Sequence, residues 1–171
     1  CESLARFYAI SFGLHTVILR PTAVYGPRDR GFERDGHVIP DLIRRVSEGA
    51  DEAPDRPLFV WGDTGIRRDF LYVADLVRAS FLAIEKAPPV TPINVGCGST
   101  VTLLELAERI WAARRSDHPE IVFDPSKPIA IRMRSVDVSL ARELLGFSTE
   151  VSLSEGLRRT TDWFLAKGAR R

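Results

Sequence analysis

Residues 2–21, ESLARFYAISFGLHTVILRP, place a helical pattern directly before a short apolar run. Four residues recur at the spacing of one helix face: Leu4, Phe7, Tyr8 and Ser11. Gly13 then stands where helices commonly end. Residues 16–19, TVIL, form a continuous run that is typical of a strand buried on both faces of a parallel sheet. A helix followed by a buried strand is half of a crossover unit, so we expect an α/β fold with a doubly wound sheet.

The remaining sequence continues to alternate between the two patterns. Helices are expected at 38–48, 74–87, 103–115, 139–145 and 153–168, and strands at 58–61, 70–73, 93–95 and 121–123. Residues 20–36 are rich in Pro, Gly, Arg and Asp and are predicted to be a loop. The helix at 74–87 is expected to be amphipathic, with Val77, Phe81 and Ile84 as its apolar side.

Composition limits the classes of partner. The chain has 171 residues, 44% hydrophobic and 27% charged, which suits a globular domain. A formal net charge of +1 argues against nucleic acid or a membrane surface as partner. Cys1 and Cys97 are too few for a disulfide framework or a zinc site, so we expect no metal and a reduced, cytoplasmic setting. No stretch approaches the roughly 20 apolar residues that cross a membrane.

Residues 19–27, LRPTAVYGP, open an ordered series of motifs. The series continues with GHVIP at 36–40, WGD at 61–63, RDFLYV at 68–73, INVG at 93–96, FDPSKP at 123–128 and LLGF at 144–147. In this order the motifs resemble the extended short-chain dehydrogenase/reductases that act on nucleotide sugars, the NAD-dependent epimerase/dehydratase family. The resemblance covers nearly all of the chain. Within that family, HVIP and FDPSKP look most like the GDP-L-fucose synthases.

The resemblance implies the C-terminal part of a Rossmann-type doubly wound sheet, interleaved with a small α/β substrate-binding subdomain. Residues 1–27 would end the dinucleotide-binding domain, and residues 28–171 would be mainly substrate-binding, with 58–100 partly returning to the Rossmann domain. Relatives carry their Gly-rich turn and their Tyr-x-x-x-Lys upstream of the position of Cys1. The first residues already read as helix. We therefore expect a fragment that lacks this machinery and is inactive alone.

For the full-length protein, the resemblance implies an enzyme that uses NADP or NAD on a nucleotide-diphospho-sugar. The first expectation is fucose synthase-like 3,5-epimerisation and 4-reduction of GDP-4-keto-6-deoxymannose. The alternatives are a nucleotide-sugar 4-epimerase, similar to UDP-glucose 4-epimerase, and a non-catalytic relative that binds nucleotide sugars. Relatives often form homodimers through helices of the Rossmann half, so a homodimer is expected only by this similarity.

His37 matches the family histidine that acts as general acid/base in the fucose synthase epimerisation. A proton beside a ketone must leave one face and return on the other, and this requires such a group. The following helix N-terminus favours a neutral imidazole. The alternative is that His37 only caps that helix.

Arg68 matches the family arginine that binds the sugar diphosphate, a role that suits a permanently charged, two-pronged donor. The alternative is a surface ion pair with Asp63 or Asp69, of little energetic weight.

Three further residues match substrate-site positions of the fucose synthases, Arg45, Trp61 and Arg134, and Lys127 is expected to bind substrate with them. Arg45 and Arg134 would lie near the diphosphate, and Trp61 in the sugar pocket. Lys127 shares a loop with Arg134. Simpler alternatives are a solvated helix face for Arg45, an edge-strand charge for Arg134 and a core position for Trp61.

The backbone at Pro21 and Thr22 matches the place where the family passes the nicotinamide ring. Ala23 is a departure, because the family usually has there an Asn that hydrogen-bonds the substrate. Ala supplies no donor, so water or another side chain replaces it, or the substrate differs.

Overall fold

The computed structural model describes residues 1–32, 37–52, 57–114, 120–124, 126 and 131–168. The chain forms two compact units, each assembled from three separate segments. Unit 1 contains residues 1–24, 69–99 and 135–151, and unit 2 contains residues 25–68, 100–134 and 152–171. The predicted division into a dinucleotide-binding part, residues 1–27, and a mainly substrate-binding part, residues 28–171, remains a prediction.

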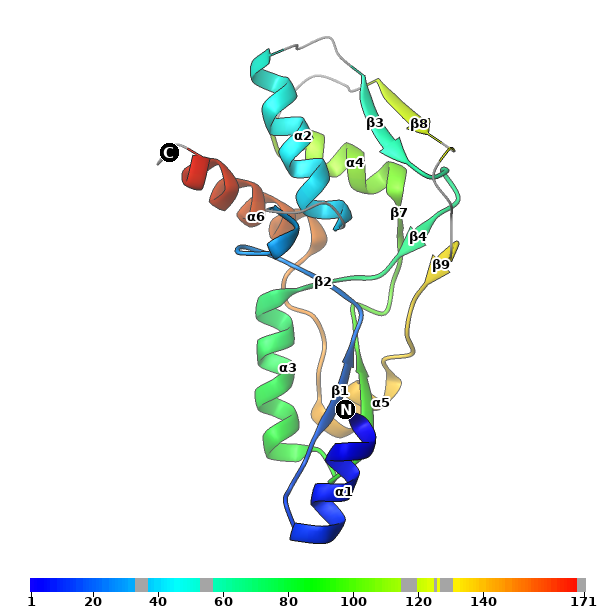
Figure 1. The fold of residues 1–171 in the computed structure, drawn as a ribbon, viewed down its shortest axis with the longest axis vertical. Coiled ribbons are helices and arrows are strands. Elements are labelled where there is room, and N and C mark those ends of the chain that lie inside the picture. Colours follow the sequence, from blue (N-terminus) through cyan, green and yellow to red (C-terminus); the bar gives the residue numbers. More distant parts are fainter. Residues whose placement is uncertain (33–36, 53–56, 115–119, 125, 127–130, 169–171) are drawn as a thin grey trace. The chain divides into compact units, whose positions relative to one another are not determined.

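Unit 1 is built on a parallel strand pair. Its elements are α1 (Glu2–Phe12), β1 (Ile18–Pro21), β2 (Ala23–Tyr25, which the unit boundary crosses), β5 (Phe70–Tyr72), α3 (Val73–Lys86), β6 (Pro92–Val95) and α5 (Ser139–Leu145). β1 pairs with β6 in parallel, with Ile18 opposite Pro92 and Pro21 opposite Val95, and Figure 1 shows the two strands side by side. β2 pairs with β5. The α/β class and the parallel pairing predicted from the sequence are confirmed.

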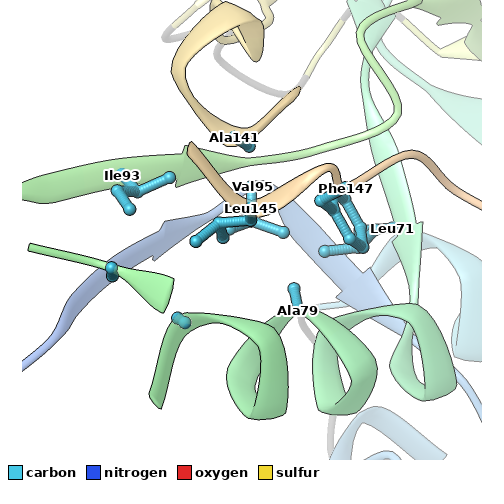
Figure 2. Close-up of a cluster of buried hydrophobic side chains, with 9 residues drawn as sticks. Leu71, Ala79, Ile93, Val95, Ala141, Leu145 and Phe147 are labelled. Carbon is cyan, nitrogen blue, oxygen red and sulfur yellow. The ribbon is translucent and has the colours of Figure 1, made fainter. Parts of the chain in front are cut away.

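The core of unit 1 lies where α3 and α5 meet β6, and Figure 2 shows this cluster. Its buried members are Leu71, Ala79, Ala83, Ala87, Ile93, Val95, Ala141, Leu145 and Phe147. From α3 the fully buried members are Ala79 and Ala83, and Leu76 and Leu82 pack against the cluster while partly buried. Full burial of a Val, Leu, Ile or Phe side chain stabilises the fold by about 1.5–3 kcal/mol.

The predicted apolar side of α3 is wrong. Val77, Phe81 and Ile84 are 50–69% exposed, whereas Ala79 and Ala83 are fully buried. The periodicity correctly marked a helix with one apolar side, but that side is formed by Ala79 and Ala83 together with the partly buried Leu76 and Leu82. The three predicted residues lie on the exposed side of the helix instead.

Helix α1 is also weakly covered, since it has no buried residue. Its first turn is held by Arg20, whose Nε and Nη2 each donate to the Glu2 carboxylate at 2.7 Å. Thr16 Oγ1 adds a longer hydrogen bond to the carbonyl of Ala5, at 3.4 Å. Gly13 ends the helix with a left-handed backbone, φ 67°, as predicted.

Unit 2 contains the remaining elements. They are η1 (Arg30–Phe32), α2 (Val38–Glu52), β3 (Leu58–Trp61), β4 (Arg67–Arg68), β7 (Val101–Thr102), α4 (Leu103–Ala112), β8 (Ile121–Asp124), β9 (Met133–Arg134) and α6 (Leu153–Gly168). β3 pairs in parallel with β8. β4 lies between antiparallel β7 and parallel β9. Helix α2 packs against α4 and α6 through four buried residues: Ile39, Leu42, Ile43 and Val46.

Local sequence signals fix several helix ends. Thr102 and Glu105 form a capping box at the start of α4, with both reciprocal hydrogen bonds present. Ser152 accepts from the backbone N–H of Glu155 at the start of α6. Gly146 ends α5 with φ 64°. All three ends were predicted from the sequence.

Other boundaries differ from the prediction. β1 occupies 18–21 instead of 16–19, because its hydrogen-bonded partner β6 begins only at Pro92. Residues 20–36, predicted as loop, contain both β2 and η1. Helix α2 continues past residue 48 to Glu52, since one glycine costs a helix only about 1 kcal/mol.

Within the described part of the chain, no helix combines the length and the apolar character needed to span a membrane.

Candidate functional site

His37 lies directly before α2, and its carbonyl accepts the N–H of Asp41. Its Nδ1 lies 2.8 Å from the Asp29 carboxylate, which also accepts the N–H of Gly31 at 2.8 Å. The His37 side chain is 62% exposed, whereas that of Asp29 is 10% exposed. A largely buried carboxylate thus orients an imidazole that reaches into solvent.

Gly31 keeps the η1 turn close to this histidine. A Cβ added at Gly31 would lie 2.6 Å from the His37 Cβ, so no other residue fits without displacing the ring. With Nδ1 donating to Asp29, Nε2 is the ring nitrogen available for proton exchange, because no hydrogen bond to it occurs among the described residues. The sequence argument considered the helix N-terminus but not the Asp29 carboxylate at Nδ1.

Arg68 in β4 is held by main-chain carbonyls. Its Nη1 donates to the carbonyls of Arg67, at 2.8 Å, and Arg132, at 3.2 Å. Its Nη2 donates to the carbonyl of Ile131 at 2.7 Å. Desolvation by burial, and then the nearby charge of Arg134, lower the pKa of Arg68 below its ordinary value. These carbonyls hold the guanidinium in place, and in the described part of the chain no carboxylate neutralises it.

The predicted alternative of an ion pair for Arg68 is wrong. Asp63 instead pairs with Arg132, at 2.8 Å. Asp69 accepts hydrogen bonds from two backbone N–H groups and from Thr22. Among the residues that the structure describes, no carboxylate lies within ion-pair distance of Arg68.

Arg134 stands opposite Arg68 in the parallel register of β9 and β4. Like charges placed directly opposite on neighbouring strands destabilise a sheet. Arg134 is exposed, so its guanidinium is accessible from solvent. Two adjacent cations of this kind, one of them half-buried, suit a bound polyanion such as a diphosphate.

Arg45 and Trp61 lie together on α2 and β3. The Arg45 guanidinium stacks over the Trp61 ring, 4.6 Å from its centroid. Arg45 also pairs with Asp41 at 2.7 Å and donates to the carbonyl of Phe59 at 3.0 Å. Trp61 is 44% exposed, so the core reading is wrong. Arg45 braces the ring in an orientation that leaves part of it open to solvent.

Pro21 and Thr22 belong to unit 1, at the carboxyl end of the parallel pair β1–β6. Ligands of open parallel sheets bind at this end of the strands. The Thr22 N–H donates to the carbonyl of Val95 at 2.9 Å, and its hydroxyl lies 3.5 Å from Asp69. The sequence analysis recognised the RDFLYV motif that contains Asp69 but did not predict its contact with Thr22.

Lys127 lies outside the described residues. The structure brings Arg68 beside Arg134 and Arg45 beside Trp61, all within unit 2. It contains no cluster of three or more His, Cys, Asp or Glu side chains suited to a metal ion in its described part.

Known proteins give this geometry a family context. The profile of the NAD dependent epimerase/dehydratase family matches residues 1–96. The chain belongs to this family. GDP-L-fucose synthase from Escherichia coli (strain K12) is 38% identical over 175 residues, which cover 96% of this chain and 52% of that protein. The chain thus spans about half the length of the curated relatives it matches.

Solved structures agree with this family membership. UDP-glucose 4-epimerase from Thermotoga maritima, with UDP-glucose, has a TM-score of 0.78 and 31% identity, over 97% of this chain and 51% of that one. UDP-glucuronic acid 4-epimerase from Bacillus cereus, with UDP-glucuronic acid and NAD, has a TM-score of 0.75 and 31% identity, over 97% and 50%. These family members share the fold of both units.

Proposed function

We propose that the protein containing this chain is a nicotinamide-dependent epimerase and reductase of a nucleotide-diphospho-sugar. Its proposed reaction is the 3,5-epimerisation and 4-reduction of GDP-4-keto-6-deoxymannose. The observation that carries this choice is the His37–Asp29 pair, because an oriented imidazole with one ring nitrogen open to solvent suits proton transfer. The 38% identity to GDP-L-fucose synthase supports the same choice.

His37 would serve as one of the two groups that exchange the protons beside the C4 ketone. The Nε2 atom would accept or return a proton, while Asp29 at Nδ1 stabilises the imidazolium that forms transiently. Epimerisation also needs a group on the opposite face of the sugar. In the fucose synthases that partner is a cysteine upstream of the position of Cys1, and Cys97 does not match it.

Arg68 and Arg134 would bind the diphosphate. Their adjacent positions on β4 and β9 offer two positive charges to one pyrophosphate. Trp61, braced by Arg45, would form a wall of the sugar pocket, where the apolar face of a sugar can stack on an exposed ring. The assignment of Lys127 to this site stays a prediction.

The backbone at Pro21 and Thr22 would hold the nicotinamide ring of NADP or NAD. Pro21 is exposed at the carboxyl end of β1, which fits a planar ring passing over the strand end. When bound, the cofactor supplies the hydride for reduction at C4. The role of this chain is to position that strand end.

A nucleotide-sugar 4-epimerase is the second candidate. Ala23 leaves room for it, since the Asn that usually hydrogen-bonds the substrate in this family is absent and the substrate can therefore differ. The Arg68–Arg134 pair would bind a UDP-sugar as readily as a GDP-sugar, and a 4-epimerase does not need His37. The resemblance to UDP-glucose 4-epimerase from Thermotoga maritima is consistent with this alternative.

The test uses the full-length protein in two incubations. GDP-4-keto-6-deoxymannose with NADPH should consume cofactor, and in D2O should incorporate deuterium at C3 and C5. If the protein is instead a 4-epimerase, UDP-galactose with NAD should be epimerised without net consumption of cofactor. His37→Gln should abolish deuterium incorporation and leave binding of the GDP-sugar intact. A lack of both activities would favour the non-catalytic relative.

A further inference from the structure

Asp69 is a buried carboxylate that joins two of the three segments of unit 1, residues 1–24 and 69–99. It is 1% exposed. Its Oδ1 accepts the N–H of Cys97 at 3.0 Å and lies 3.5 Å from the Thr22 hydroxyl, and its Oδ2 accepts the N–H of Gly98 at 3.1 Å. A buried charge is costly unless its oxygens are hydrogen-bonded, so this arrangement depends on all of these donors. Burial raises the pKa of Asp69, and the three hydrogen bonds oppose that shift.

Close packing transmits the position of this carboxylate to the end of β1. A Cβ added at Gly96 would lie 2.7 Å from Asp69 Oδ2 and 2.9 Å from Thr22 Cγ2, so Gly96 allows both to approach its backbone. The N–H of Thr22 is bonded to the carbonyl of Val95, the residue before this glycine. The backbone at Thr22 therefore cannot shift without disturbing the turn that Asp69 holds.

We propose that Asp69 is the positioning residue of the nicotinamide-binding backbone at Pro21–Thr22. The proposal rests on the proposed function, in which this backbone holds the nicotinamide ring. Asp69 does not touch the ring. It fixes Thr22 through the hydroxyl and through the Gly96–Gly98 turn, so that the strand end keeps one conformation when the cofactor binds.

The acceptor-only character of a carboxylate explains why the residue must be Asp. All three groups that face it are donors, two backbone N–H groups and one hydroxyl. An asparagine has the same shape but would direct its NH2 group at one or more of these donors. Asp69→Asn should thus loosen the turn without creating a cavity.

Asp75 supplies a matched control in the same unit. It is 2% exposed and likewise accepts two consecutive backbone N–H groups, those of Glu150 at 3.0 Å and Val151 at 3.1 Å. Its third contact is Arg78. Asp75→Asn therefore removes the same kind of buried carboxylate. None of its contacts within the described residues is with Thr22 or Gly96.

The experiment compares the two variants in the full-length protein. The dissociation constant for NADPH, and separately for NADH, is measured by fluorescence titration, and stability by urea unfolding. Both variants should lose stability, but only Asp69→Asn should weaken binding of the preferred cofactor, by about ten-fold, equivalent to about 1.4 kcal/mol. Unchanged cofactor binding in Asp69→Asn, or an equal loss in Asp75→Asn, would overturn the proposal.

Thr22→Val provides a second test if Asp69→Asn does not fold. It removes the hydroxyl donor and keeps the buried carboxylate and its two backbone contacts. Cofactor binding should weaken by a smaller factor, about two- to five-fold, and wild-type affinity would overturn the proposal. A wild-type protein that binds neither NADPH nor NADH would overturn the proposed function as well, whereas a wild-type binder with unaffected variants overturns only the role of Asp69.

Discussion

Replacing Arg68 should weaken binding of the nucleotide sugar. An arginine has five N–H donors, and three donor contacts of Arg68 go to main-chain carbonyls. Within the described residues, two N–H groups of Arg68 then remain without an acceptor. Together they can donate a bidentate pair of hydrogen bonds to one phosphate. At about 1.5 kcal/mol for each charge-assisted hydrogen bond, Arg68→Met should raise the dissociation constant by about 100-fold.

Calorimetric titration of the full-length protein with GDP-fucose, and separately with UDP-glucose, measures this loss. Arg68→Lys keeps the charge but not the fork, and should lose about ten-fold. Arg109→Met is the matched control, because it removes an exposed arginine of the same unit. Within the described residues, the Arg109 side chain donates a hydrogen bond to Ser154 alone. If Arg68→Met bound the wild type's preferred nucleotide sugar with wild-type affinity, Arg68 would not be the diphosphate ligand.

Three further outcomes are expected. Gly31→Ala should push the His37 ring aside and reduce deuterium incorporation by the full-length protein at least about ten-fold, measured by NMR, because its Cβ would lie 2.6 Å from that of His37. Ile93→Ala should lower the free energy of unfolding by about 2–5 kcal/mol in urea titrations, since its side chain is fully buried. Hydrogen bonds from Arg158 and the arginine after it lower the pKa of Glu155 from 4.5 to about 2. Stability from this group is present above pH 4.5 and lost as the pH falls toward 2, so Glu155→Gln should flatten the acid side of the pH–stability profile.

Signals that act within a few residues could be read from the sequence. The start of α4, the start of α6 and the end of α5 each follow from a cap that the sequence displays. The helical spacing of Ile39, Leu42, Ile43 and Val46 in the sequence likewise marks the side of α2 that is buried. The β2 strand was missed, since its three residues are held by pairing with β5 and not by a pattern of their own.

Contacts between distant segments could not be predicted in the same way. Arg68 and Arg134 are neighbours only because β4 and β9 pair in register, and no local pattern encodes that register. The role of Asp69 depends on Thr22 and on the turn at Cys97–Gly98, which lie far away in sequence. On α3 the periodicity showed an apolar side, but which residues are buried, Ala79 or Phe81, depends on the side of the helix that packs against the core of unit 1.

The absence of any buried residue in α1 has a consequence for its motion. An isolated helix of 11 residues is marginal in water, because most helical stability in proteins comes from tertiary packing. In the described chain the Glu2–Arg20 pair and the Thr16 hydroxyl supply most of what holds α1 in place. In a protein made of residues 1–171 alone, its amide protons should therefore exchange with solvent by local opening, orders of magnitude faster than those of β6.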